Sequence, residues 1–256
     1  MPSLFIAHGS PMIIIEKNKY VDFLTSFPKT LKKPEAIVIF SAHYEEPIQT
    51  ISTANQYSTI YDFYGFPKEM YKITYPAKGN PTLAKEIHGL FKDNGIKSVF
   101  DEKRGLDHGA WTILKIMYPN LDVPVVSLSL NPNAPLEELY KIGASLAPLR
   151  EKGVLIIGSG VTVHNFNKIN FEDENAKDKW AASFDDWLIK NMKDWNTSDL
   201  FEYRKKAPHA KDAVPTAEHF VPLILAMGAG ANTKQSSVIY REYKYGSMSN
   251  LCIKFD

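Results

Sequence analysis

The sequence of 256 residues contains a single cysteine, Cys252. One cysteine cannot form an intrachain disulfide, and it cannot build a thiolate zinc cluster. A metal bound by this chain must therefore rely on imidazole and carboxylate groups. The sequence also has no apolar run of the roughly 20 residues needed to cross a bilayer. Its N-terminus, MPSLFIAHGSP, lacks a basic leader followed by a long apolar stretch, so we expect a cytoplasmic protein with no membrane partner.

An excess of charge of either sign is also missing. Thirty lysines and arginines stand against 29 aspartates and glutamates, which gives a formal net charge of +1. This balance argues against a chain-wide electrostatic footprint for nucleic acid or for an acidic membrane surface. We therefore expect a small-molecule partner and no nucleic acid. The composition does not specify an oligomeric state.

Short apolar runs alternate with amphipathic stretches, a pattern that favours an α/β protein. The chain is 44% hydrophobic and shows no repeat, low-complexity tract or linker, so we expect one domain over residues 1–256. Its predicted architecture has three layers, with a mostly parallel central sheet flanked by helices. The expected strands are Leu4–Ala7, Ala36–Ser41, Val123–Leu130, Val154–Gly158, Ser237–Arg241 and Leu251–Lys254. The expected helices are Pro81–Asn94, Thr112–Tyr118, Pro135–Arg150, Asp178–Lys193 and Thr216–Met227.

Five of the seven histidines lie in short sequences flanked by helix and strand breakers. A lone histidine in such a place is usually a packing residue, but three of the five follow the apolar runs SLFIA, AIVIFSA and VLIIGSG. Open α/β sheets place ligands beyond the carboxyl ends of their strands, so these side chains are expected to converge as a metal site. The five are His8, His43, His108, His164 and His219. The glycines that would permit a sharp turn or a close approach there are Gly9, Gly109, Gly158 and Gly160.

The last of these histidines stands beside a second candidate ligand, Glu218. If both lie on the predicted helix, their side chains point about 100° apart, and one site is not expected to receive both. If Glu218 is the third metal ligand, the ligands form the two-histidine, one-carboxylate triad of non-haem iron oxygenases. If His219 is the third ligand, all the protein ligands are histidines. The spacing alone leaves both alternatives open.

A series of short motifs runs from His8 to about Ser249, and so covers nearly the whole chain. They are HGSP (8–11), SAHYE (41–45), DFYGFPKEMY (62–71), YPAKG (75–79), DHGAW (107–111), MYPNLDVPVVSLSL (117–130), VHN (163–165), PTAEHFVPL (215–223) and GSMS (246–249). In this order they resemble the class III extradiol ring-cleavage dioxygenases, and most closely the DOPA dioxygenase type.

This resemblance implies an Fe(II) enzyme that opens a monocyclic catechol beside its two hydroxyls with O₂. It implies the metal ligands His8, His43 and His219, with Glu218 as a minor alternative because another subgroup uses a glutamate. His164 is implied to be close enough to the metal to act as a base or as a further ligand. His108 is implied to line the same pocket.

The reaction needs both a base and an acid. A base must remove a phenolic proton as the catechol binds, and an acid must later protonate an oxygen; histidine titrates in the range for both. We assign His164 as the base and His108 as the hydrogen-bond or proton donor, two roles that can be exchanged. Three protein ligands leave open metal positions for catechol and O₂, and neutral imidazoles leave a 2+ centre that favours a catecholate.

Further residues are predicted to shape the pocket. The aromatic stretch with Tyr64, Phe66, Tyr71 and Tyr75 is expected to wall a flat ring, although an ordinary packed loop fits it equally well. Asp107 is predicted to orient His108 or the neighbouring backbone. The expected substrate contacts are Ser10, Tyr64, Tyr71, Asp107 and Ser247. The cationic partners weighed for a charged substrate substituent are Lys68, Lys72, Lys78 and Arg104.

Two other functions fit the same histidines. A zinc-dependent hydrolase would use the metal to lower the pKa of a bound water. A catalytically silent metal-binding protein would use His164 as a fourth ligand, because structural zinc sites are normally closed by four protein ligands. Zn(II) in a purified protein would not exclude dioxygenase chemistry, since the affinity order favours zinc over Fe(II).

Overall fold

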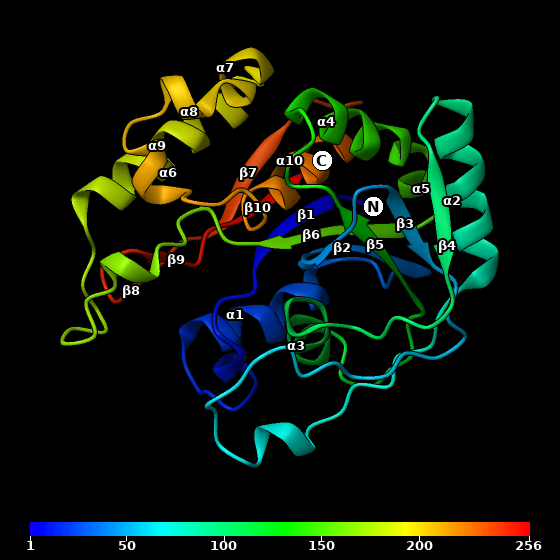
Figure 1. Cartoon of the computed structure of the whole chain (residues 1–256), viewed down its shortest axis with the longest axis horizontal. Coiled ribbons are helices and arrows are strands. Elements are labelled where there is room, and N and C mark those ends of the chain that lie inside the picture. The colour runs from blue at the N-terminus through cyan, green and yellow to red at the C-terminus, as the bar shows by residue number, and fades with distance from the viewer.

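A computed structural model describes residues 1–256 and centres on one eight-stranded sheet (Figure 1). From one edge to the other the strands are β4 (Ser98–Asp101), β3 (Gln49–Ser52), β5 (Val125–Leu130), β2 (Ala36–Glu45), β6 (Val154–Gly160), β1 (Ser3–Ala7), β10 (Cys252–Phe255) and β7 (Ser236–Tyr240). The four central strands β5, β2, β6 and β1 are parallel. At one edge β10 pairs antiparallel with β1, and β7 pairs antiparallel with β10. At the other edge β3 pairs antiparallel with β5 and parallel with β4.

Helices cover both faces of this sheet, which gives three layers (Figure 1). One face carries α2 (Pro81–Asp93), α4 (Leu136–Ser145), α5 (Ala147–Glu151) and α10 (Val221–Ala229), and the other carries α1 (Lys19–Ser26) and α3 (His108–Met117). Beside α10 lie α6 (Lys179–Lys193), α7 (Thr197–Phe201), α8 (Tyr203–Lys206) and α9 (Ala210–Ala213). The remaining elements are the short hairpin β8 (Tyr243–Lys244) and β9 (Met248–Ser249) and the 3₁₀ turns Pro11–Ile14, Phe27–Thr30, Met70–Lys72 and Phe166–Lys168.

Two hydrophobic cores lie on opposite faces of the sheet because strand residues alternate between the faces. In β1, Phe5 belongs to the core under α4 and α10, whereas Leu4 and Ile6 belong to the core over α1 and α3. Strands β5 and β6 are buried along their whole length, which agrees with sequences that are mostly apolar and contain no charged residue. The predicted α/β fold with a mostly parallel central sheet is confirmed.

Several predicted element boundaries were wrong. The helix predicted at Thr112–Tyr118 begins earlier, at His108, and the one predicted at Thr216–Met227 begins only at Val221. The segment Pro135–Arg150 forms two helices that meet at Leu146. Strand β2 continues to Glu45, so His43 lies within the strand and not beyond its end.

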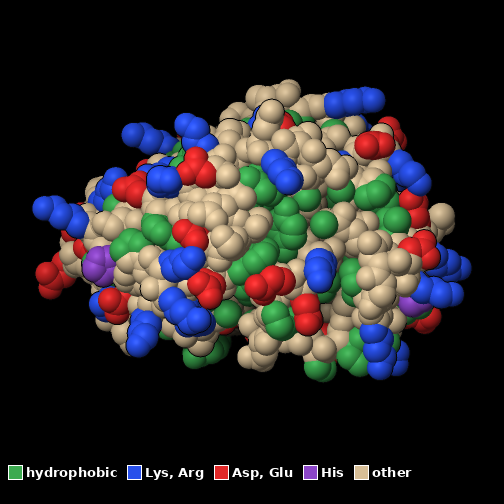
Figure 2. Space-filling view, turned by 90° about the horizontal axis from the view of Figure 1, so that it is seen from above, with side chains coloured by type: hydrophobic (Ala, Val, Ile, Leu, Met, Phe, Trp, Pro, Cys, Tyr) green, Lys and Arg blue, Asp and Glu red, His purple; other side chains and the backbone are tan.

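The surface agrees with the near-neutral composition. Figure 2 shows acidic and basic side chains mixed across one face, with a strip of hydrophobic side chains through its middle. That face shows no extended patch of side chains with the same charge. No helix has both the length and the apolar character needed to cross a lipid bilayer.

Candidate active site

The five predicted histidines meet at one end of the parallel strands. His8 directly follows β1, His43 lies near the end of β2, and His164 follows β6 after a short turn. These three strands are neighbours in the sheet, so their carboxyl ends lie side by side. His108 is the first residue of α3, and His219 lies two residues before α10.

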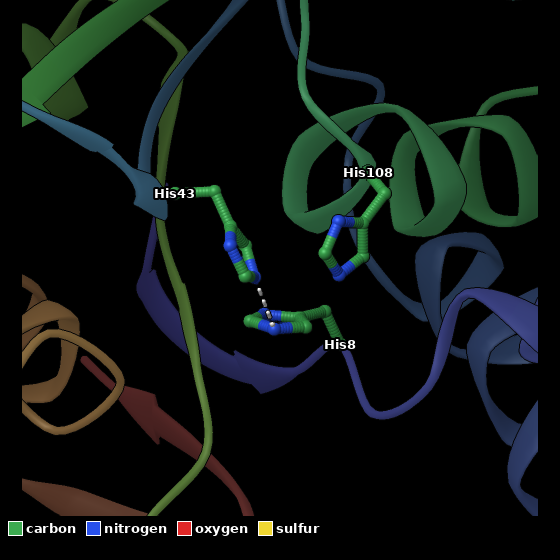
Figure 3. Close-up of side chains that lie close together, drawn as sticks. All are labelled: His8, His43 and His108. Carbon is green, nitrogen blue, oxygen red and sulfur yellow. Dashed lines mark hydrogen bonds between the residues drawn. The ribbon is translucent and has the colours of Figure 1, made fainter. Parts of the chain in front are cut away.

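The imidazole rings are in direct contact. Nε2 of His43 lies 3.2 Å from Nε2 of His8, and the rings of His8, His43 and His108 point toward one another (Figure 3). Their ligand nitrogens lie within 4.8 Å of one another. The ring centroid of His219 lies 5.2 Å from that of His8 and 4.9 Å from that of His43. His164 stacks on His219 with centroids 3.9 Å apart.

Hydrogen bonds at Nδ1 fix two of these rings. Nδ1 of His8 lies 3.1 Å from Ser159 Oγ, and that hydroxyl donates to the carbonyl of Gly109. Because the hydroxyl proton is used there, Ser159 accepts from Nδ1 and leaves a lone pair on Nε2 of His8. Nδ1 of His219 lies 2.9 Å from the carboxylate of Glu218, which has the same consequence. Partners of this kind typically orient metal-binding histidines.

Burial and mutual repulsion keep three of the histidines, His8, His43 and His164, neutral. Burial, together with repulsion from the neighbouring rings, holds the pKa of His8 well below its ordinary value. Burial and the nearby His108 lower the pKa of His43 to about 3. Burial and the stacked His219 lower the pKa of His164 to about 3. Neutral imidazoles are the form that binds metal.

Glycines let other backbone segments approach the cluster. A Cβ at Gly109 would lie 2.6 Å from Ser41 Oγ and 2.9 Å from the ring of His43. A Cβ at Gly160 would overlap the carbonyl oxygen of His219. These contacts are closer than real Cβ atoms make. Glycine at the two positions therefore allows α3 and the segment before α10 to lie against the strands.

Glu218 and His219 do not stand on a helix, so the predicted angular separation does not apply. The Glu218 carboxylate instead accepts hydrogen bonds from the His219 ring and from the Thr216 hydroxyl. Burial opposes its ionisation, but these hydrogen bonds outweigh that effect and lower its pKa to about 2. His219 lines the cavity beside the other histidines, whereas Glu218 lines a different cavity. A carboxylate oxygen of Glu218 nevertheless lies within 4.8 Å of ring nitrogens of His164 and His219.

Sequence reasoning missed Asp62. Its carboxylate lies 3.0 Å from Nδ1 of His108 and 3.7 Å from Nδ1 of His43, and it accepts a hydrogen bond from the His108 backbone N–H at 2.9 Å. Burial raises its pKa, but the interactions with His108 outweigh burial and hold the pKa below its ordinary value. The signal is present in the sequence, because Asp62 opens the motif DFYGFPKEMY, directly ahead of the aromatic residues that were predicted to wall the pocket.

The histidines line a cavity of about 500 Å³. Apolar walls come from Phe63, Phe66, Phe166 and Met248, and Ser10 and Tyr64 from the predicted substrate contacts also line it. Tyr64 is 92% exposed and therefore stands at the mouth.

Three other predicted substrate contacts do not reach this cavity. The Tyr71 hydroxyl donates to the carbonyl of Phe63 from behind the wall. Asp107 is buried as the N-cap of α3 and accepts from Ser41 Oγ at 2.5 Å, so it positions the start of the helix that carries His108. Ser247 is buried and donates to the carbonyl of Lys168.

The donor set suits a divalent transition metal such as iron or zinc. Nε2 of His43 faces Nε2 of His8 at 3.2 Å, a contact that neutral rings make when one nitrogen donates its N–H to the other. A bound cation would take the place of that N–H and use a lone pair on each of the two nitrogens. His8, His43 and His108 form one possible ligand group, and His219 contacts the first two of them.

Comparisons with known proteins find relatives over nearly the whole chain. The model of the family "Catalytic LigB subunit of aromatic ring-opening dioxygenase" matches residues 2–252. The chain is 41% identical over 257 residues to a 4,5-DOPA dioxygenase extradiol of Beta vulgaris, covering 99% of this chain and 96% of that protein. It is 32% identical over 256 residues to a 4,5-DOPA dioxygenase extradiol of Escherichia coli K12, covering 99% and 94%. The crystal structure of an uncharacterized protein from Escherichia coli K12 superposes with a TM-score of 0.84 at 29% identity, over 100% of both chains.

Proposed function

The chain belongs to the family of the catalytic LigB subunit of aromatic ring-opening dioxygenases, and from this membership we propose that it cleaves a monocyclic, DOPA-like catechol with O₂. The reaction breaks the ring C–C bond between a hydroxylated carbon and its unsubstituted neighbour. One atom of O₂ ends in a carboxylate and the other in an aldehyde. The observation that carries this proposal is the convergence of five histidines in one apolar-walled cavity. Residues 1–256 act as one catalytic domain.

We propose His8, His43 and His219 as the ligands of an Fe(II) ion. Ser159 and Glu218 support this set, because they hold the Nδ1 atoms of His8 and His219 and leave both Nε2 atoms free. Bound iron supplies a Lewis-acidic, redox-active centre that holds catecholate and O₂ side by side. Zn(II) fits the same imidazoles and would be a substitute metal in the purified protein.

We propose that His164 acts as the general base. No side chain holds its ring nitrogens by a hydrogen bond, while its backbone N–H is fixed by the carbonyl of Ala213 at 2.9 Å. The ring therefore lies at the cavity wall with a free nitrogen that can accept a phenolic proton. His164→Ala is expected to keep most of the metal and to lower turnover by about 10²–10⁴-fold. Complete loss of metal would instead make His164 a ligand.

We propose that His108 acts as the proton donor. The Asp62 carboxylate lies 3.0 Å from Nδ1 of this ring and positions it, so the opposite nitrogen can donate to an oxygen of the substrate. Phe63 packs edge-on against the same ring with centroids 5.9 Å apart. The apolar contact limits the positions that water can take beside the ring.

The function is tested by loading the protein anaerobically with Fe(II) and measuring O₂ uptake with DOPA, caffeate, protocatechuate and homoprotocatechuate. We expect O₂ uptake with at least DOPA, together with a yellow semialdehyde product. A chelator-treated sample serves as the control. Absence of uptake with every catechol, in protein that holds one iron per chain, would contradict the proposal.

A further inference from the structure

A second cavity of about 420 Å³ adjoins the histidine cavity. We call it the tail chamber. The two cavities share five lining residues, so one continues into the other; the shared residues are Gly9, Ser10, Phe66, Phe166 and Met248. None of Lys68, Lys72, Lys78 and Arg104 lines either cavity.

The walls of the tail chamber are apolar, with Ile13, Val161 and Ile169 among the lining residues. Phe166 and Phe171 line it although they are 68% and 76% exposed. Large apolar side chains left exposed around a hollow are typical of a ligand-binding site. This chamber therefore suits the methylene groups of a substituent that extends from a ring held at the histidines.

One cation and one anion line the same chamber. Lys244 Nζ lies 3.8 Å from the carboxylate of Glu16, and no other lysine, arginine, aspartate or glutamate is among the lining residues. The side chains of Lys244 and Glu16 are 21% and 36% exposed, so solvent reaches both only in part. The pair presents opposite charges to one ligand.

Both charged groups are held in place before any ligand binds. Glu174, from outside the chamber, accepts a hydrogen bond from Lys244 Nζ at 2.6 Å. The side-chain amide of Asn18 donates to Glu16 at 2.7 Å, and its Oδ1 accepts from the backbone N–H of Val21 at the start of α1. Charged groups fixed in this way lose little freedom on binding.

We propose that the tail chamber binds the zwitterionic α-amino acid group of an amino-acid catechol, with its carboxylate at Lys244 and its ammonium at Glu16. This inference rests on the proposed function, because the ring must sit at the histidines for its tail to enter the chamber. A zwitterion matches the paired charges, whereas a tail with one charge satisfies only one of them. The chamber therefore selects substrate without taking part in ring opening.

The test compares four catechols on the iron-loaded protein: L-DOPA, dopamine, dihydrocaffeate and 4-methylcatechol. They carry a zwitterionic, a cationic, an anionic and a neutral tail. The variants are Lys244→Met and Glu16→Gln. Lys177→Met is the matched control, since Lys177 is an exposed lysine beside the same hairpin, with Nζ 5.2 Å from the Tyr243 ring centre, and lines neither cavity. Anaerobic calorimetric titration with L-DOPA gives a readout of binding apart from turnover.

We expect Lys244→Met to raise the KM and the anaerobic Kd for L-DOPA about tenfold or more, the effect of a lost hydrogen bond to a charged group. The KM for dihydrocaffeate should rise as well, while the values for dopamine and 4-methylcatechol should stay within about twofold. Glu16→Gln should raise the KM for L-DOPA and dopamine but not for dihydrocaffeate. The kcat for 4-methylcatechol should be unchanged in both variants and in the control.

Equal KM values for L-DOPA in wild type, Lys244→Met and Glu16→Gln would overturn the tail chamber while leaving the proposed function intact. Equal losses with all four catechols would also overturn it, because they would show a general structural defect. If Lys244→Met does not fold, Glu16→Gln still decides through its contrast between dopamine and dihydrocaffeate. Failure of the proposed function is distinct, since wild type would then turn over none of the four.

Discussion

At the scale of single residues, the site is defined by what holds each histidine as much as by the histidines themselves. Ser159 and Glu218 each form a hydrogen bond with Nδ1 of a ring and leave its Nε2 available, and the Asp62 carboxylate lies 3.0 Å from Nδ1 of His108. The five histidines were predictable, because each marks the end of an apolar run or a breaker-flanked motif. Ser159 was not, since it lies inside a buried strand and its role depends on a carbonyl from another element.

The ligand set is tested by metal content. His219→Ala is expected to lose most of its metal under dilute chelator, because Nε2 of this ring is free and its ring contacts both His8 and His43. His108→Ala is expected to retain it, since Asp62 engages that ring at the side of the cavity. Glu218→Gln keeps a hydrogen-bonding side chain and should weaken metal binding only in part, about 10–100-fold.

Elemental analysis after dialysis, with far-UV spectra to confirm folding, makes this measurement. Full occupancy in His219→Ala together with loss in Glu218→Ala would assign the carboxylate as the third ligand. Loss of metal in His108→Ala, with metal retained in His219→Ala, would instead assign His8, His43 and His108 as the three metal ligands.

Asp62 is predicted to position His108, because it accepts from the His108 backbone N–H and lies 3.0 Å from Nδ1 of the ring. Asp62→Asn removes the charge but keeps the size, so turnover should fall about 10–100-fold while the fold stays intact. The interactions with His108 hold the pKa of Asp62 below its ordinary value, so the carboxylate is ionised at neutral pH, and the loss of kcat should be present across the neutral range with unchanged metal content. Equal kcat values in wild type and Asp62→Asn across that range would show that Asp62 does not position His108. Asp93→Asn, an exposed position at the end of α2, is the control.

At the scale of elements, the site depends on close backbone contact between β6 and the segment before α10. Gly160 allows this contact, since a Cβ there would overlap the His219 carbonyl and lie 3.1 Å from Pro222 Cγ. Gly160→Ala should therefore destabilise the protein by about 1–3 kcal/mol, the range for overpacking, and should also weaken metal binding through His219.

Thermal unfolding and metal titration of Gly160→Ala test this contact. Gly89→Ala is the matched control: nothing lies within 4 Å of a Cβ at this α2 position, so alanine there should stabilise the helix by about 0.5–1 kcal/mol. A Tm for Gly160→Ala at or above that of wild type would show that the two segments are free to separate.

The elements that the sequence did not predict are those whose stability comes from neighbours. Strands β3 and β4 have four residues each and lie at one sheet edge, too short to show a periodic pattern. Strand β2 was predicted to end at Ser41, but pairing of Glu45 with Leu130 extends it past His43. The start of α3 could have been read from Asp107, whose side chain caps Ala110, because aspartate is a preferred N-cap.

At the scale of the whole molecule, the neutral histidine cluster links stability to pH. His8, His43 and His164 have folded-state pKa values below the ordinary 6.5, with His43 and His164 at about 3. Between these values and 6.5 the unfolded chain binds more protons than the folded one. The stability from these groups is therefore complete above about pH 6.5 and is lost as the pH falls, with a slope of up to about 1.4 kcal/mol per pH unit for each histidine.

Urea unfolding of the metal-free protein at pH 7.5, 6 and 5 measures this loss. The carboxyls of Asp107 and Asp185 oppose it, because burial raises their pKa, but they do so equally in a variant that keeps both. His43→Gln removes one of the neutral rings and should show a shallower decline between pH 6.5 and 5. Equal slopes in wild type and His43→Gln would mean that the cluster does not control acid stability.

The central claim is that this chain transfers both atoms of O₂ to a catechol. A single turnover of the iron-loaded protein under ¹⁸O₂, with L-DOPA and rapid borohydride trapping of the aldehyde, tests it most directly by mass spectrometry. The account predicts a ring-opened product with one ¹⁸O atom in the new carboxylate and one in the trapped alcohol. A product that takes its new oxygen only from water, as a hydrolase would produce, would contradict it.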